Sequence, residues 1–440
     1  MLHRALDQSY STEVRHRLTL LVAARTAANA CFRFAPPFLA TIASGLGVPL
    51  ERMGIALAIS ELSGLFSTFT GSVGERMHRR TAMATGLAGT AIATGGAAAS
   101  PNMWVFCAAL VLLAQSKVLF DLGLGAWVSD RVPYAQRGRV MGLTETSWAL
   151  GLLLGVTAMG LVTAATNWRV GYALGATAVL AMAGLVARTV GADPAAHEHH
   201  ARTAPTGAKV APRSWRLVVG AFCLMGSTQM LFVTFGSWLK DHYGMTAAGV
   251  SAVVFGLGFC ELFSSLSAAR FTDHWGKARS AAIGAGVMMP AALILSVVHG
   301  HLWIALPMLV IAIAAFEFAI VSTIPLGSEL VRDNPARGIA ILFTAGTLGR
   351  AAMSIPATRL YERHGMAWPA LGCAALAGLA VVAVLSYGDT AHGDTAHGDT
   401  AHGDTAHGDT AHGDTVHGDT VHGDVVHGDV VHGDAVLGDN

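Results

Sequence analysis

The sequence predicts an all-α membrane protein in which about twelve transmembrane helices form two pseudo-symmetric six-helix bundles. The first observation is composition: 53% of the 440 residues are hydrophobic, only 13% are charged, and the mean hydropathy is +0.51. Soluble domains contain about 25% charged residues. The second observation is that long apolar runs alternate with short loops, and the third is that a basic, glycine-led loop follows both the second and the eighth run.

The apolar runs are predicted to be helices because they are continuous and do not alternate between apolar and polar residues. Barrel strands would alternate, and only helices and closed barrels satisfy their backbone groups inside a bilayer. Most runs reach the roughly 20 residues that a helix needs to cross about 30 Å of hydrocarbon. The runs lie at residues 18–44, 53–74, 81–99, 103–128, 140–164, 168–188, 215–238, 246–269, 280–298, 302–325, 338–358 and 366–386.

Basic residues indicate the orientation, because Lys and Arg accumulate in short cytoplasmic loops. Most of the 28 Lys and Arg residues fall in the N-terminal segment and in the segments that follow even-numbered runs. We therefore expect both termini in the cytoplasm. Arg far outnumbers Lys, and Ala and Gly are abundant, which is typical of a bacterial gene of high G+C content. The expected location is the cell (inner) membrane, as a multi-pass protein.

Two segments interrupt this apolar pattern. Residues 190–213 gain Pro, His and charge, which predicts a linker. From Gly388 onward the unit Gly-Asp-Thr-Ala-His repeats every five residues, and such a sequence cannot bury enough apolar surface to become ordered. The predicted parts are a cytoplasmic N-terminal segment (1–17), an N-terminal six-helix bundle (18–189), a cytoplasmic linker (190–213), a C-terminal six-helix bundle (214–386) and a disordered cytoplasmic tail (387–440).

Histidines of the tail, from His392 to His432, could bind protons or Zn and Ni ions. We favour a tandem duplication of the coding sequence instead, because the unit is nearly unchanged along the tail. The five cysteines fall inside predicted helices and show neither metal-ligand nor disulfide spacing. We expect no metal site and no cofactor.

Several function classes are disfavoured by what the sequence contains. It has no Gly-x-x-x-x-Gly-Lys-Ser/Thr loop, which disfavours an ATP-driven pump. The net charge is zero and the basic residues are spread along one predicted membrane face, which disfavours nucleic-acid binding. We expect a protein that is not an enzyme.

The loop after the second run, Gly-Ser-Val-Gly-Glu-Arg-Met-His-Arg-Arg, resembles the Gly-x-x-x-Asp-Arg-x-Gly-Arg-Arg signature of the major facilitator superfamily. It departs from the signature at Glu75, where the family has Asp, and at His78, where the family has Gly. The residues of this gating motif are Gly71, Glu75, Arg76, Arg79 and Arg80 in the first copy and Asp273, Gly276 and Lys277 in a degenerate second copy after the eighth run. A second repeat pairs Ser129-Asp130 with Ser328-Glu329, so two repeats at a similar offset indicate a six-plus-six duplication.

The resemblance covers about residues 15–386. It implies two six-helix bundles that rock about a central cavity and open it alternately to each side of the membrane. It also implies that the motif latches the cytoplasmic side of the cavity, with Glu75 paired to basic groups at a neighbouring helix end and the arginines near lipid headgroups and helix C-termini. The alternative is a basic loop that only sets the topology.

The fifth run contains Gly142, Gly151 and Gly155, which resemble the start of the glycine-rich motif of drug/proton antiporters in the superfamily. The family has a proline after the third glycine, where this chain has Val156. Small residues at this spacing let helices approach closely, so ordinary helix packing is the alternative explanation.

Charged residues inside the predicted helices are the candidates for the site. Each costs about 2.5–3.5 kcal/mol at the centre of a bilayer, so these residues must face a cavity or pair with one another. The candidate cavity residues are the ionisable Arg25, Arg33, Glu61, Lys117, Asp121, Glu145, Glu261, Glu317 and Arg350 and the polar Asn29 and Gln229.

Helical spacing predicts how some of these residues are arranged. Arg25, Asn29 and Arg33 recur every four residues and should form one polar stripe. Lys117 and Asp121 are also four apart, and we expect them to neutralise each other. The arginines could bind substrate or could equally be locked in charge pairs that hold helices together.

The acidic residues are the stronger functional candidates, because loss of water disfavours the charged form of a carboxylate and prepares it to bind a proton. Glu61 and Glu261 stand in similar surroundings, Glu-Leu-Ser-Gly-Leu-Phe-Ser and Glu-Leu-Phe-Ser-Ser-Leu-Ser, which suggests an interface role. Glu317 is the leading candidate for proton coupling, because its nearest neighbours on the helix include no cation. Asp121 and Glu261 follow in that order.

The sequence as a whole favours a secondary active transporter that works by alternating access, expected to be a monomer whose partners are a small-molecule substrate, a proton and the lipid bilayer. We expect proton-coupled efflux of small, partly apolar organic molecules. One alternative is an uptake permease for an anionic nutrient, whose charge Arg25, Arg33, Lys117 and Arg350 could bind. Another is a membrane sensor or scaffold that signals through the repeat tail.

Overall fold

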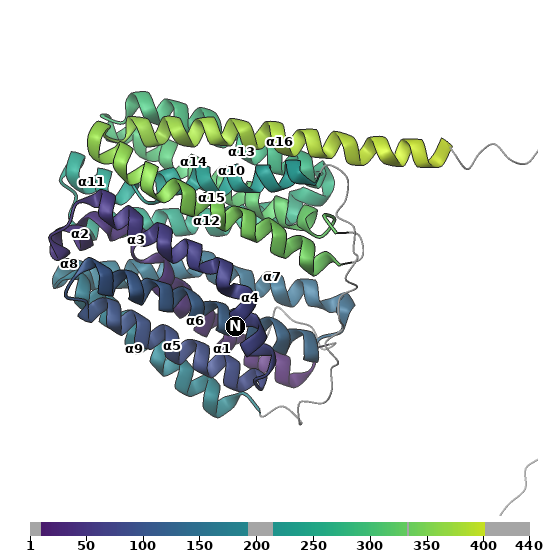
Figure 1. The fold of residues 1–440 in the computed structure, drawn as a ribbon, viewed down its shortest axis with the longest axis horizontal. Helices are drawn as coiled ribbons and strands as arrows, with labels where there is room; N and C mark the ends of the chain where they lie inside the picture. The colour runs from purple at the N-terminus through teal and green to yellow at the C-terminus, as the bar shows by residue number, and fades with distance from the viewer. Residues whose placement is uncertain (1–9, 192–213, 332–333, 401–440) are drawn as a thin grey trace, which may run out of the picture. The chain divides into compact units, whose positions relative to one another are not determined.

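The computed structural model describes residues 10–191, 214–331 and 334–400, and every regular element in them is helical (Figure 1). The expected N-terminal segment before residue 10, most of the expected linker and residues 401–440 of the tail lie outside these described residues. The chain up to His392 forms one compact unit, and the remainder is a separate one.

The first half of the chain contains six consecutive helical segments, three of which are interrupted. The first segment changes direction after Arg33, where two consecutive prolines, Pro36 and Pro37, start a short 3₁₀ turn. The elements are α1 (Thr12–Arg33), η2 (Pro36–Phe38) and α2 (Leu39–Leu46); α3 (Leu50–Leu62), η3 (Ser63–Phe66) and α4 (Ser67–Glu75); α5 (Arg79–Ala99); α6 (Met103–Arg131); α7 (Tyr134–Leu150), the π-helical turn η4 (Gly151–Val156) and α8 (Thr157–Ala165); and α9 (Trp168–Thr189).

The second half repeats this order with fewer interruptions. Its elements are α10 (Trp215–Phe232) and α11 (Phe235–Tyr243), α12 (Ala247–Trp275), α13 (Lys277–Val298), α14 (Leu302–Gly327), α15 (Pro335–His364) and α16 (Ala367–Thr400). The α16 helix extends to Thr400, past the predicted end of the last apolar run at residue 386. Adding residues to an existing helix avoids the cost of starting a new one, and the repeat contains no proline to stop it.

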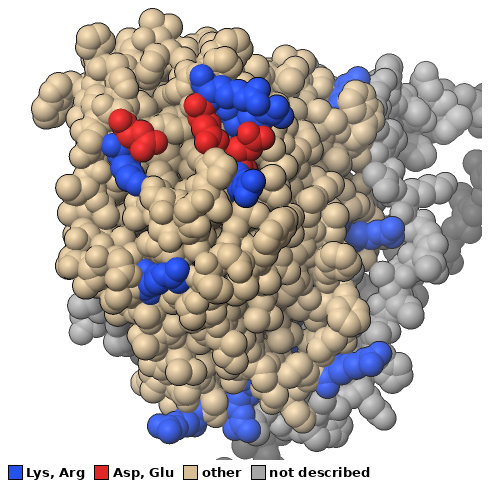
Figure 2. Space-filling model, turned by 60° about the vertical axis from the view of Figure 1, so that its left-hand side comes forward, with Lys and Arg blue, Asp and Glu red and all other residues tan. Residues whose placement is uncertain are grey.

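Nine helices of the described residues are long and apolar enough to cross a membrane by length and composition. They cover the fourth to the twelfth predicted run, and the first three runs are also helical but are more polar or interrupted. For the first three of the twelve predicted crossings, the support is that these runs are helical, not that they pass the length and composition criterion. Figure 2 shows one face of the molecule, on which most atoms belong to uncharged residues and the charged side chains gather in a few groups.

The two halves share local geometry at equivalent positions. The first segment of each half is broken near its middle, after Arg33 in one and after Phe232 in the other. Each of these segments also ends at a glycine with positive φ, Gly47 at 66° and Gly244 at 64°. Left-handed backbone at a helix end favours glycine, so both halves use the same stop signal.

A single apolar core crosses between the halves at the end of the molecule that contains α2 and α11 (left in Figure 1). It includes Phe38 and Trp168 from the first half and Trp238 and Leu239 from the second. Gly236 of α11 makes the closest approach, because a Cβ atom there would collide with the carbonyl of Pro37. The halves are thus closed against each other at this end.

The cores are separate at the opposite end, where the predicted cytoplasmic loops lie. One core contains Val14, Val128 and Val186 and draws only on the first half. Another contains Leu217 and Val384 and draws only on the second half. The two halves thus share one core at one end of the molecule and form separate cores at the other end.

Candidate functional site

The most buried ion pair joins the two halves. Arg33, at the end of α1, donates two hydrogen bonds to the Glu261 carboxylate of α12, with Nη1–Oε2 at 2.8 Å and Nη2–Oε1 at 2.7 Å. A third bond, from Nη1 to the Trp148 carbonyl, is 3.1 Å long. The two side chains are only 6% and 3% exposed. Paired donors on paired acceptors are the strongest form of such a contact.

A second ion pair joins the halves at another place. Arg350 of α15 donates through Nη2 to Oε2 of Glu61, which belongs to α3, at 2.6 Å. Glu61 and Glu261 are the two glutamates in similar sequence surroundings, and each contacts an arginine of the opposite half. The similar sequences around Glu61 and Glu261 therefore each provide one ion pair between the halves.

A third group of charges lies within the first half. Arg25 donates through Nε to Asp121 at 3.0 Å and through Nη1 to Glu145 at 2.8 Å. Lys117 also contacts Asp121, at 2.6 Å, so the i,i+4 ion pair expected on α6 is present. Asp121 thus lies between two cations, which stabilises its ionised form.

Aromatic rings surround the same cations. The Arg33 guanidinium lies 4.9 Å from the ring centroid of Trp148 and 5.1 Å from that of Phe232. Lys117 lies 5.7 Å from the Phe32 ring and 5.5 Å from Trp148, and Arg350 lies 5.9 Å from Phe32. Rings at these distances attract cations through their quadrupoles.

Phe32, Trp148 and Phe232 are not among the residues predicted for the cavity, because an aromatic residue does not stand out from the apolar sequence of a membrane helix. Phe232 occupies the end of the first helix of its half, as Arg33 does in the other, but these helix ends lie inside the runs predicted at 18–44 and 215–238. Phe32 carries no sequence signal for the cavity either, because its neighbour Arg33 points in a different direction around the helix.

Glu317 has a different environment from the other acidic residues. It is 6% exposed on α14, and its Oε1 accepts a hydrogen bond of 2.6 Å from the Ser265 hydroxyl of α12. No basic side chain of the described residues forms an ion pair with it. Ser265 lies about one helical turn from Glu261 on α12, which places Glu317 near the Arg33–Glu261 pair.

The two polar candidates hold helices together. Asn29 lies between Arg25 and Arg33 on α1 and donates to Ser147 of α7 at 3.2 Å, while its Oδ1 atom is buried without a partner among the described residues. Gln229 of α10 donates to Ser354 of α15 at 2.8 Å. Both residues are almost fully buried.

The gating-motif residues lie away from these charges, at the end with divided cores. Arg79 pairs with Asp130 at 3.0 Å, and Lys277 pairs with Glu329 at 2.7 Å. The two repeats found in the sequence thus contact each other in the same way within each half. The Glu75 side chain lies outside the described part of the chain, so its pairing stays a prediction.

The turn in this motif differs between the halves. Gly276 precedes α13 with φ 84°, a conformation that favours glycine. His78 precedes α5 with φ −59°, which any residue adopts. The first half therefore forms this turn without the family's glycine. The other motif residues are Gly71 in α4, Arg76 just after it, Arg80 in α5 and Asp273 in α12.

The glycines of the fifth run fall into two groups. A Cβ atom at Gly155 would collide with Ala30 of α1, and one at Gly151 would lie 2.8 Å from the Cβ of Asn29. At Gly142 a Cβ atom would have no neighbour within 4 Å among the described atoms. Gly151 and Gly155 therefore let η4 pack on the polar stripe of α1, and Gly142 has no such role.

Comparison with known proteins identifies the family. The sequence profile of the Major Facilitator Superfamily matches residues 21–354. The uncharacterised MFS-type transporter YwfA of Bacillus subtilis (strain 168) is 27% identical over 334 residues, which cover 72% of this chain and 78% of the relative.

Solved structures show the same fold at lower identity. A bacterial homologue of the human lysosomal transporter Spinster, in an inward-facing and unoccupied conformation, has a TM-score of 0.65 at 14% identity, covering 85% of this chain and 95% of that one. The human organic anion transporter MFSD10 (TETRAN) has a TM-score of 0.58 at 18% identity, covering 85% and 100%. Since the family profile matches most of this chain, the chain belongs to the Major Facilitator Superfamily, whose members transport molecules across membranes by alternating access.

Proposed function

We propose that this transporter is a proton-coupled exporter of small, partly apolar organic molecules and that Glu317 binds the coupling proton. The supporting observation is the environment of Glu317, a buried carboxylate that has a hydroxyl partner but no cation among the described side chains. An acid that is removed from water and lacks a cation binds a proton more readily than one in an ion pair.

The pairing of the cations supports this choice over the uptake of an anionic nutrient. Each of Arg25, Arg33, Lys117 and Arg350 contacts a carboxylate at 3.0 Å or less. An anion could bind them only by displacing such a carboxylate, which would leave a buried charge without a partner. The anionic alternative is still worth testing, because one structural relative is named as an organic anion transporter. A sensor or scaffold has no need for this set of buried charges.

A linkage between Glu317 and the contact between the halves follows from their positions. Glu317 accepts a hydrogen bond from Ser265, which lies about one helical turn from Glu261 on α12, so ionised Glu317 repels the Glu261 carboxylate and protonation removes this repulsion. Since Arg33 and Glu261 belong to different halves, proton binding then changes the free energy of their contact. The substrate would bind beside the same charges, against the rings of Phe32, Trp148 and Phe232.

A two-step experiment tests the proposal. A thermal-shift screen of the purified protein against organic cations, neutral compounds and organic anions first identifies a ligand, since a ligand stabilises the state that binds it. The uptake of this ligand is then measured in liposomes with an acidic interior. Ethidium is the first organic cation to be tested in both steps. We expect uptake above that of protein-free liposomes and its loss when an ionophore removes the pH gradient. Uptake of anions alone, or uptake that does not respond to the gradient, would reject this proposal.

A further inference from the structure

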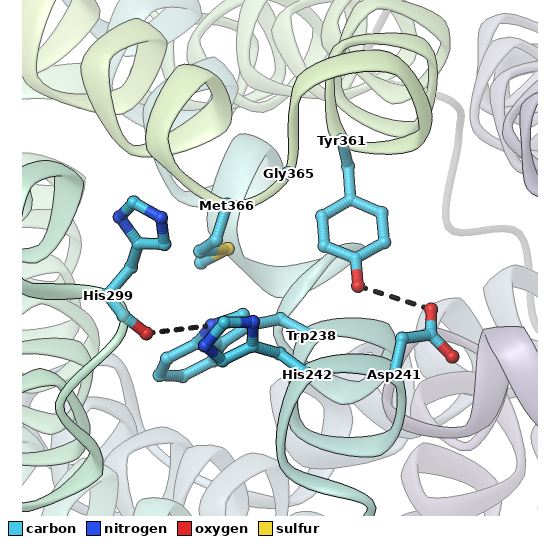
Figure 3. A pocket seen from close by; sticks show the side chains of 7 residues that line it. All are labelled: Trp238, Asp241, His242, His299, Tyr361, Gly365 and Met366. Atoms are coloured by element: carbon cyan, nitrogen blue, oxygen red, sulfur yellow. Dashed lines mark hydrogen bonds between the residues drawn. The ribbon is translucent and has the colours of Figure 1, made fainter.

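A small half-open cavity of about 180 Å³ lies in the second half, at the closed end of the molecule (Figure 3). Its walls come from α11, from the connection between α13 and α14, and from the end of α15 with the connection between α15 and α16. The lining residues are Trp238, Asp241, His242, His299, Tyr361, Gly365 and Met366. None of them belongs to the charged groups described above, and the transport proposal uses none of them.

Two imidazoles in this cavity have ligating capacity. The Nδ1 atom of His299 lies 2.9 Å from the Ser296 carbonyl, which can only accept, so Nδ1 carries the hydrogen and Nε2 keeps its lone pair. A hydrogen bond of this kind fixes the tautomer and ring orientation of metal-binding histidines. The His242 ring is exposed and has no hydrogen-bond partner among the described residues.

The backbone beneath these imidazoles is held firmly. The His299 carbonyl accepts hydrogen bonds from Trp238 Nε1 at 3.3 Å and from the Tyr243 hydroxyl at 2.6 Å. The ring of Tyr243 also packs edge-on against the ring of His242, with centroids 4.8 Å apart. Both imidazoles are thus attached to one rigid aromatic group.

Their separation is close to that of two ligands on one metal ion. The ring centroids of His242 and His299 are 6.2 Å apart. A Zn–N bond of about 2.0–2.1 Å on each ring places two centroids roughly 5 Å apart at the tetrahedral angle, so rotation of the exposed His242 ring by about 1 Å toward His299 completes the pair. No third His, Cys, Asp or Glu of the described chain joins them, so water would complete the coordination.

We propose that His242 and His299 form a binding site for a divalent transition-metal ion such as Zn²⁺. The site would lie on the outer side of the membrane, because the segment at residues 240–245 is predicted to be external. A metal ion there would fix α11 to the connection between α13 and α14. The adjacent Lys240 donates to Ala40 and Ser44 of the first half at 3.3 Å, so this end of α11 also contributes to the closed contact between the halves.

Calorimetric titration of the full-length purified protein with Zn²⁺ tests the site. The histidines of the tail and linker are the same in every variant, so differences in Zn²⁺ binding between variants report on this site alone. The matched control is His364→Ala, since His364 lies at the same end of the second half but does not line the cavity. We expect wild type and His364→Ala to bind one Zn²⁺ ion at this site with the same affinity. The affinity of His242→Ala and of His299→Ala for this ion should be at least tenfold lower.

Two further measurements keep the test decisive. His242→Asn and His299→Asn keep a polar side chain, and they replace the alanine variants if those do not fold. The unfolding temperature should rise with Zn²⁺ by a larger amount in wild type and His364→Ala than in either site variant. Equal Zn²⁺ binding and equal thermal shifts in all variants would overturn the proposal.

Discussion

At the scale of single residues, the Arg33–Glu261 pair has opposing effects on stability. Removing both charges from water costs several kcal/mol, and their close bidentate contact offsets much of that cost. The net contribution of the intact pair is therefore small. Loss of one partner is costly, because the remaining charge stays buried, and this asymmetry makes the pair suitable for joining two halves that must also separate.

Glu261→Gln should destabilise the folded protein by about 3–5 kcal/mol, since it leaves Arg33 buried without a counter-charge. The control is Glu51→Gln, which breaks an exposed pair with Arg359 at 3.6 Å and should cost less than about 1 kcal/mol. Unfolding in detergent micelles, followed by circular dichroism, measures both. Similar losses in the two variants would show that the buried pair has no special role.

How much of the site was predictable depends on the sequence distance between partners. The Lys117–Asp121 pair could be predicted, because the geometry of one helix determines it. The partners of Arg33 and Arg350 could not, because Glu261 and Glu61 are separated from them by 228 and 289 residues, and helical spacing contains no information on that scale. The similar surroundings of the two glutamates indicated an interface but not the residues across it.

At the scale of elements, the π-helical turn η4 connects α7 to α8 and packs between α1 and α12. Such turns occur mainly at functional sites, and this one lies beside the polar stripe of α1. The glycine spacing of the fifth run predicted close packing but not the π-helical geometry. The interruption at η3 was likewise unpredictable, because Ser63–Phe66 contains no proline.

A comparison of Gly155→Ala with Gly142→Ala should separate the effect of close helix packing on stability from the effect of helix propensity. Gly155→Ala forces α1 and η4 apart and should cost about 1–3 kcal/mol, as overpacking does elsewhere. Gly142→Ala meets no atom and should be neutral or stabilising by up to about 1 kcal/mol, because Ala is the better helix former. Chemical denaturation of the two variants measures the difference. If both had the same effect, the assigned contact with Ala30 would be wrong.

At the scale of the whole molecule, one core shared by the halves and two cores confined to single halves distinguish its two ends. The membrane orientation of these ends comes from the distribution of Lys and Arg and stays a prediction. Single cysteines introduced at residues 76–80 should react only with reagents applied from the cytoplasmic side, and those at 240–245 only from the external side. Labelling with the opposite pattern would reverse the orientation.

The repeat tail is expected to be dispensable for the transport unit, since residues up to His392 form a compact unit without it. Deletion of residues 393–440 should leave the amount of protein in the membrane and the transport rate within about twofold of wild type, because few contacts are lost where a compact unit ends. Immunoblots of membranes and the liposome assay measure these quantities. A large loss of transport at normal protein levels would indicate a regulatory tail.

The central claim, that Glu317 binds the coupling proton, is tested most directly by the Glu317→Gln variant in liposomes. Glutamine imitates the protonated acid and keeps an acceptor for Ser265. Transport driven by a pH gradient should fall at least tenfold, while exchange of labelled for unlabelled substrate across the membrane should continue, because exchange needs no net proton movement. Glu13→Gln, at a half-exposed pair with Arg131 outside the cavity and the gating motif, is the control and should keep both activities. If Glu317→Gln retained full gradient-driven transport, the assignment of the proton to Glu317 would be contradicted.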